Sequence, residues 1–93
     1  MATQRKKVPL GNFPEGAVQV IRSSEALGGC VREQRKQLAL TQADLAGVGN
    51  TGNRFIVDLE SGKPTVQLQK VLDVMELLGL ELVVRRKAAG GSQ

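Results

Sequence analysis

Apolar side chains recur at helical spacing in four stretches of this sequence, and each stretch is bounded by residues that favour helix ends. The first stretch follows Ser23, whose hydroxyl can accept a hydrogen bond from a free backbone N–H group and so cap a helix. Gly28 and Gly29 lie inside this stretch and weaken the helix by about 1 kcal/mol each relative to alanine. Its apolar residues fall on one face: Leu27, Cys30, Val31 and Leu38.

The second and third stretches lie close together. Thr41 can cap a very short helix over Gln42–Val48, which turns Leu45 and Ala46 inward. The letters "GVGN" then predict a turn, in which Asn50 is the non-glycine residue best suited to a left-handed backbone. The third helix is predicted within "NTGNRFIVDLESGK", at residues 50–63.

Glycine, proline and threonine mark the boundary between the third helix and a fourth. Gly62 serves as a C-cap, and Pro64 comes shortly after it. Thr65 is predicted to cap the fourth helix, which Gly79 ends. The apolar residues of the fourth helix again recur at helical spacing: Leu68, Val71, Leu72, Met75 and Leu78.

After Gly79 the pattern changes to "LELVVRR", which has a strand-like period of two. A single strand cannot satisfy its own backbone hydrogen bonds, so we expect this one to pair antiparallel with the same strand of a second copy. Alternatively, these residues extend the fourth helix or pack back on their own chain. The residues predicted for the dimer strand are Leu80, Leu82, Val83 and Val84.

These elements divide the chain into four parts. Residues 1–20 carry glycine, proline and a basic cluster without any period, which predicts a flexible basic arm or, alternatively, a tail without function. Residues 21–79 contain the helices, residues 80–86 form the dimerisation strand, and residues 87–93 are expected to be a flexible tail.

Composition argues against catalysis. A chain of 93 residues fits one small domain, and a core of this size commonly gains stability from oligomerisation. Histidine, the usual general base and commonest metal ligand, is absent, and no glycine-rich phosphate-binding motif is present. Cys30 is the one cysteine, so we expect neither an intrachain disulfide nor a cysteine zinc site. We therefore expect no enzyme activity, no metal and no cofactor.

Charge and hydropathy point to the kind of partner and the compartment. The 13 Lys and Arg residues exceed the 9 Asp and Glu residues and give a net charge of +4, which suits a polyanionic partner. No apolar run approaches the roughly 20 residues of a membrane span. The start of the chain lacks the apolar centre of a secretory signal, so a cytoplasmic protein is expected.

Two short helices joined by a tight turn, within a four-helix unit on a basic chain, describe a helix-turn-helix. The stretch "TQADLAGVGNTGNRFIVDLESGK" resembles the lambda-repressor/Cro-like (XRE) helix-turn-helix family, whose pattern is T-Q-x-x-L-A, a turn, and I-x-x-x-E-x-G. The resemblance implies a mainly α, lambda-repressor-like four-helix DNA-binding domain. The residues that match the pattern are Thr41, Gln42, Leu45, Ala46, Ile56, Glu60 and Gly62.

The resemblance also implies how DNA would be bound. The third helix would lie in the major groove, where arginine can bind guanine bidentately, asparagine can bind adenine and valine can contact a thymine methyl. An aspartate there would accept from cytosine or repel nearby phosphates. By family position, the base-reading residues are Asn53, Arg54, Val57 and Asp58. The residues expected at DNA phosphates are Thr41, Gln42, Gly52, Lys63 and Thr65.

Arg35 and Glu60 receive a structural role from the same resemblance, because the family commonly joins an arginine of the first helix to this glutamate. Alternatively, Arg35 is free to contact a phosphate. The turn departs from the family, since Asn50, Thr51 and Gly52 stand where glycine, valine and serine are usual. The cap of the third helix is therefore expected at Gly52 or, one residue earlier, at Thr51.

The C-terminal half, "RFIVDLESGKPTVQLQKVLDVMELLGLELVV", resembles the HipB-like antitoxins, and this resemblance covers about residues 21–86. It implies a homodimer in the bacterial cytoplasm that represses its own operon by binding palindromic operator DNA. It further implies a partner, a HipA-like serine/threonine-kinase toxin that the antitoxin holds inactive. Two alternatives are a transcriptional regulator without a toxin and an interaction module that has lost DNA binding.

Overall fold

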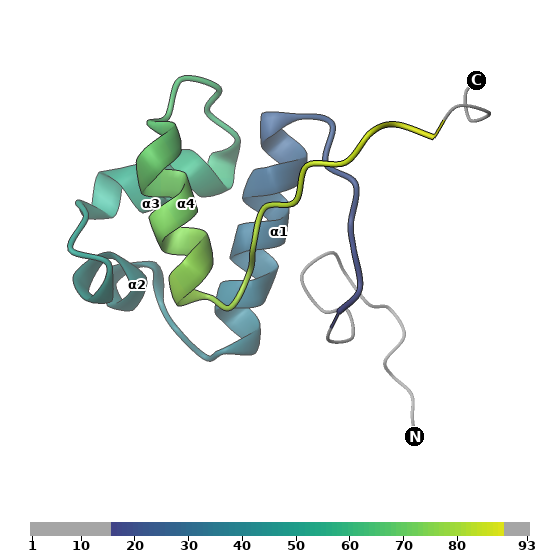
Figure 1. Ribbon diagram of the computed structural model, residues 1–93. Helices are drawn as coiled ribbons and strands as arrows, with labels where there is room; N and C mark the ends of the chain where they lie inside the picture. Colours follow the sequence, from purple (N-terminus) through teal and green to yellow (C-terminus); the bar gives the residue numbers. More distant parts are fainter. Residues whose placement is uncertain (1–15, 89–93) are drawn as a thin grey trace.

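The computed structural model describes residues 16–88, and this part of the chain contains four α-helices (Figure 1). All four predicted helices are present. The first fifteen residues of the predicted arm and the last five of the predicted tail lie outside the described residues. The helices are α1 (Ser24–Gln37), α2 (Gln42–Val48), α3 (Asn53–Ser61) and α4 (Leu68–Leu77).

The predicted caps of α1 and α2 are confirmed. Ser23 Oγ accepts a hydrogen bond from the Ala26 N–H group at 3.0 Å. Thr41 Oγ1 accepts from the Asp44 N–H group at 3.0 Å, and Asp44 Oδ2 accepts from the Thr41 N–H group at 2.9 Å. The two residues thus form a reciprocal capping box that satisfies two otherwise free donors at the start of α2.

The predicted cap of α4 is wrong. Thr65 lies exposed in a turn, and α4 begins at Leu68 after Gln67, which makes no side-chain cap hydrogen bond. Between them Val66 is half-buried and packs against the hydrophobic core. The helix therefore begins two residues later than a cap at Thr65 predicts, after the half-buried Val66.

Leu38, which the sequence predicts as the last apolar residue of the first helix, lies just outside it. Leu38 follows the last residue of α1 and is 47% exposed. The chain turns at Ala39, whose backbone is left-handed with a φ of 60°, and this turn directs Leu40 toward the core instead. A non-glycine residue adopts this conformation at a cost of about 1–2 kcal/mol, which a helical periodicity cannot predict.

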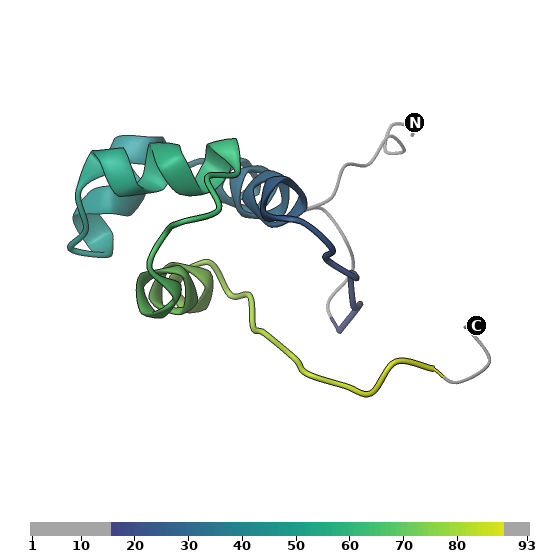
Figure 2. The same ribbon diagram turned by 90° about the horizontal axis from the view of Figure 1, so that it is seen from above.

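The core receives side chains from every helix. α1 and α2 both pack against α3, and Figure 2 shows α4 on one side of the layer that these three helices form. Aliphatic residues fill the centre, as the lack of Trp and Tyr requires. The largest fully buried side chains are Val31, Leu45, Ile56, Val74 and Leu78.

Gly28 allows α1 and α3 to touch along their backbones. A Cβ atom at this position would lie 2.4 Å from the carbonyl oxygen of Leu59 and 2.8 Å from that of Glu60. No side chain fits there, so the glycine that weakens α1 locally is required by the packing of α3. The two helices are consequently held at a distance set by main-chain atoms.

The residues after α4 are extended but form no β-strand within the described part of the chain, so the predicted C-terminal strand is not observed in the isolated chain. The physical reason is that a strand which pairs with a second copy has no ladder partner in one chain. Leu80 is half-buried against the core, whereas Val83 and Val84 are 56% and 89% exposed. Across residues 16–88, every helix is too short or too polar to cross a lipid bilayer.

Candidate nucleic-acid interface

α3 has two faces with different surroundings. Ile56 and Leu59 point into the core and are 0% and 2% exposed. Asn53 and Arg54 lie in the first turn of the helix and are exposed, and Val57 follows one turn later on the same outer side. The helix therefore presents three of the four predicted base-reading side chains to solvent while two aliphatic residues fix its position.

The fourth predicted base reader, Asp58, is occupied by two cations. Arg54 Nε donates to Asp58 Oδ1 at 3.1 Å, and Lys63 Nζ lies 3.5 Å from Asp58 Oδ2. The Arg54 side chain is 85% exposed, so its outer guanidinium nitrogens point into solvent. The cluster of Arg54, Asp58 and Lys63 thus places two positive groups and one shielded carboxylate on the outer face.

The start of α3 is one residue after Gly52, which is its N-cap and supplies no side-chain hydrogen bond. This assigns the cap to Gly52 rather than Thr51. Thr51 is half-buried, and its N–H group donates to the Ala46 carbonyl at 3.0 Å. Asn50 has a φ of 55°, so the predicted left-handed turn residue is confirmed. The turn therefore keeps the geometry of a helix-turn-helix despite its unusual residues.

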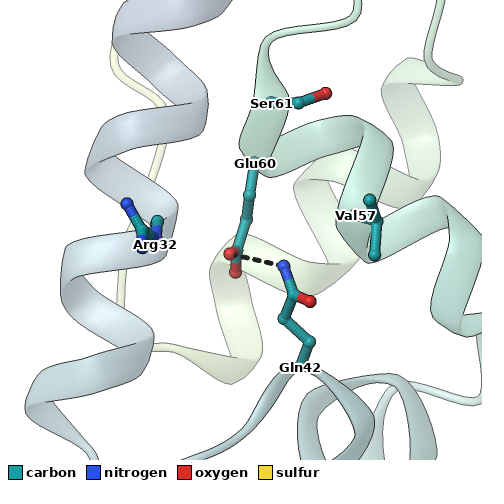
Figure 3. Close-up of a pocket in the computed structure, with 5 residues that line it drawn as sticks. All are labelled: Arg32, Gln42, Val57, Glu60 and Ser61. Carbon is teal, nitrogen blue, oxygen red and sulfur yellow. Dashed lines mark hydrogen bonds between the residues drawn. The ribbon is translucent and has the colours of Figure 1, made fainter.

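The five residues expected at DNA phosphates are placed differently from one another. Thr41, Gly52, Lys63 and Thr65 are all exposed; the first two are the caps of α2 and α3, and the last two lie in the segment between α3 and α4. Gln42 is half-buried, and its Nε2 donates to Glu60 Oε1 at 3.0 Å (Figure 3). One hydrogen of this amide group is therefore already used inside the protein, and the other remains for a ligand.

Arg35 and Glu60, which the sequence predicts as a structural pair, are in contact. Arg35 Nε donates to Glu60 Oε2 at 2.6 Å and Arg35 Nη2 donates to Glu60 Oε1 at 3.0 Å. Arg35 Nη1 also donates to the Leu40 carbonyl at 2.7 Å. The side chains are 9% and 3% exposed, so this bidentate pair joins α1 to α3, and to the segment before α2, in a nearly dry environment.

Two side chains in this region have shifted pKa values. The hydrogen bonds to Glu60 raise the pKa of Arg35, against the lowering effect of its burial, so Arg35 remains a cation. The hydrogen bonds from Thr41 lower the pKa of Asp44, because they favour its carboxylate form. Both shifts favour the charged forms, the Arg35 cation and the Asp44 carboxylate, which make these hydrogen bonds.

Sequence reasoning missed two residues here. Asp44 completes the capping box, and its signal was its position three residues after a threonine cap. Arg32 lines a surface hollow together with Gln42 and Val57. The sequence feature that could have identified Arg32 is its position as a basic residue one helical turn before Arg35. Within residues 16–88, no group of three or more His, Cys, Asp or Glu side chains is arranged to hold a metal ion. Cys30 is buried, which raises the pKa of its thiol.

Comparison with known proteins agrees with this geometry. Residues 31–84 match the helix-turn-helix family. An uncharacterized HTH-type transcriptional regulator of Sinorhizobium fredii, y4mF, is 50% identical over 62 residues, which are 67% of this chain and 82% of that protein.

Solved structures share the fold. A HipB-O4 20mer complex superposes with a TM-score of 0.69 at 21% identity, over 76% of this chain and 100% of the other. A HipA-HipB-O2-O3 complex gives a TM-score of 0.70 at 21% identity, over 76% and 100%. The architecture of a four-helix HipB-like domain is thereby shown. The chain belongs to the helix-turn-helix family of XRE type and is a DNA-binding regulator, not an enzyme.

Proposed function

We propose that this chain is a homodimeric repressor that binds palindromic operator DNA upstream of its own operon and is the antitoxin of a HipA-like serine/threonine-kinase toxin. The observation that carries the proposal is the outer face of α3, where Asn53, Arg54 and Val57 are exposed beside a buried anchoring face. In a helix-turn-helix the amino-terminal residues of the second helix contact base edges in the major groove.

Arg54 is the principal base reader in this proposal. Its guanidinium group is exposed and bound through one nitrogen, so the remaining donors match the O6 and N7 atoms of guanine. Asn53 suits adenine and Val57 suits a thymine methyl. Asp58 orients Arg54 in the free protein. If Arg54 or Lys63 moves away from Asp58, the free carboxylate oxygen can accept a hydrogen bond from cytosine. The residues proposed to hold the phosphates on either side are Thr41, Gln42, Gly52, Lys63 and Thr65.

The dimer would form through the extended segment after α4. Leu82, Val83 and Val84 are 58%, 56% and 89% exposed, and three neighbouring aliphatic residues in this state favour a partner that covers them. The backbone of this segment also offers donors and acceptors for an antiparallel pair. Sedimentation equilibrium is expected to give a dimer for the wild type and a monomer for a variant with Leu82→Lys and Val84→Lys. A dimeric variant would contradict this contact.

The toxin partner is supported by the solved structures with the same fold, one of which contains HipA and HipB together. A regulator without a toxin is the second candidate, and it is favoured by the 50% identical relative, whose name describes a transcriptional regulator. Purification of the tagged chain expressed from its own operon distinguishes the two. A kinase that co-purifies in stoichiometric amount supports the antitoxin, and purification of the chain alone supports the second candidate.

DNA binding is tested by fluorescence anisotropy with two labelled duplexes of equal length, one from upstream of the chain's own coding sequence and one with that sequence shuffled. Wild type is expected to prefer the upstream duplex. Arg54→Ala is expected to lose about 1–3 kcal/mol of this preference, which is about 5- to 150-fold. Arg22→Ala, an exposed arginine before α1, is the control and should retain the preference. An unchanged ratio in Arg54→Ala would refute the groove assignment.

A further inference from the structure

A shallow hollow of about 290 Å³ opens where α1, α2 and α3 meet (Figure 3). Val57 belongs to the outer face of α3, and Gln42 begins α2, so the hollow borders the proposed DNA-contacting surface on its α1 side. The residues that line it are Arg32, Gln42, Val57, Glu60 and Ser61.

The charge of this hollow is positive although a glutamate lines it. Both carboxylate oxygens of Glu60 already accept hydrogen bonds from Arg35, and one of them also accepts from Gln42. The Glu60 side chain is 3% exposed, so an approaching anion does not meet a bare carboxylate. Arg32 is exposed on α1 and forms no ion pair or side-chain hydrogen bond within the described part of the chain. Its charge is therefore the one that the hollow leaves uncompensated.

The available donors indicate the chemistry of the ligand. Arg32 lines the hollow from α1, whereas Glu60 and Gln42 line it from α3 and α2 (Figure 3). A guanidinium group presents donors in a planar fork that fits phosphate oxygens. Gln42 has a second amide hydrogen that its bond to Glu60 does not use. The Ser61 hydroxyl donates to the Asp58 carbonyl at 2.9 Å, so Ser61 adds no free donor in this state. One guanidinium and one amide donor suit a singly charged phosphate diester.

We infer that Arg32, which lies outside the two helices of the helix-turn-helix, forms with Gln42 the seat for one backbone phosphate of the DNA strand that borders the major groove. This inference rests on the proposed function, in which α3 enters that groove. The first helix of a helix-turn-helix crosses the DNA backbone, and Gln42 starts that helix. A phosphate contact fixes the position of the protein on DNA but carries no sequence information.

Arg32→Gln tests the inference with the two duplexes described above, at about 50 to 200 mM salt. Each phosphate contact contributes about 0.9 to the slope of log K against log salt, so the affinity of the variant should fall about 3.5-fold less than that of wild type per lost contact over this range. The weakening should be equal for the upstream and shuffled duplexes. Arg32→Lys, which keeps the charge, should restore the slope. Lys36→Gln on the same helix is exposed but does not line the hollow, and it should keep the wild-type slope.

The outcomes separate the inference from the proposed function. A wild-type slope in Arg32→Gln, or a loss confined to the upstream duplex, overturns the phosphate seat while leaving DNA binding intact. Failure of wild type to bind either duplex overturns both. Because Arg32 is exposed, Arg32→Gln should have the circular dichroism spectrum and urea midpoint of wild type. If folding is unchanged, a smaller salt slope can be attributed to the lost phosphate contact.

Discussion

Glu60→Gln is expected to destabilise the domain by about 3–5 kcal/mol, because it leaves the Arg35 guanidinium buried without a counter-charge. Two hydrogen bonds at 2.6 and 3.0 Å join these side chains, which are 3% and 9% exposed. A domain of this length has a free energy of unfolding of roughly 5–14 kcal/mol, so the variant loses a large part of it. At about 4–8 °C per kcal/mol, the melting temperature should fall by about 12–40 °C.

Urea unfolding followed by circular dichroism measures this change, with Asp58→Asn as the matched control on the same helix. The Asp58 pairs involve an Arg54 side chain that is 85% exposed and a Lys63 side chain that is 50% exposed, so solvent screens them. Breaking them should cost less than about 1 kcal/mol. A double variant, Arg35→Met with Glu60→Leu, removes both buried charges and should recover part of the loss. Recovery is incomplete because the Leu40 carbonyl also loses its donor.

Two results would refute this reasoning. If Glu60→Gln costs no more than Asp58→Asn, the buried pair behaves like a surface pair and does not brace α3. If the double variant costs the sum of its single variants, Arg35 and Glu60 act independently, since a coupled pair shows a non-additive energy.

Two further predictions concern the backbone and the acid side of the stability profile. Gly28→Ala should lower the free energy of unfolding, measured in urea, by about 1–3 kcal/mol, because its Cβ would lie 2.4 Å from the Leu59 carbonyl oxygen. The control, Gly47→Ala, meets nothing within 4 Å and should raise the free energy of unfolding by up to about 1 kcal/mol. Changes of the same sign in the two variants would contradict the close contact of α1 with α3. The Thr41 hydrogen bonds lower the pKa of Asp44, so their stabilisation is present above its ordinary value of 3.8 and is lost as pH falls through the lower folded-state pKa. Asp44→Asn should therefore weaken the loss of stability measured between about pH 5 and 2, and an unchanged profile would show that the Asp44 carboxylate does not contribute to this loss.

Local signals explain how much of the fold could be predicted. Ser23 and Thr41 cap their helices through contacts within three residues, and Gly62 ends α3 with a φ of 91° that favours glycine. These features depend on residues that are near neighbours in the chain, so they can be predicted from the sequence. The left-handed backbone of Ala39, with a φ of 60°, differs, because it precedes Leu40, which packs against a core built from residues distant in the sequence.

The features of the candidate site that depend on near neighbours or on family position could likewise be predicted from the sequence. The spacing of α3 separates inward from outward residues, and family position pairs Arg35 with Glu60. Long-range geometry supplies the rest: the hollow that Arg32 lines exists because α1, α2 and α3 meet there, and Gln42 bonds to a side chain 18 positions away. The proposed dimer strand would likewise need a second copy, because one extended segment cannot satisfy its own backbone hydrogen bonds.

The interaction energies of the two ion pairs of α3 indicate which pair can break when DNA binds in the proposed complex. The exposed pair of Arg54 and Asp58 is worth at most about 1 kcal/mol, whereas a bidentate arginine–guanine contact discriminates by about 1–3 kcal/mol. If Arg54 leaves Asp58 to reach a base, the lost pair is therefore offset at guanine and costs up to about 1 kcal/mol at a wrong base. The buried pair of Arg35 and Glu60 cannot exchange in this way, since separating its partners costs about 3–5 kcal/mol. α3 thus combines a fixed ionic anchor with a weak, replaceable pair, and the weak pair holds Arg54 in place without preventing it from reading a base.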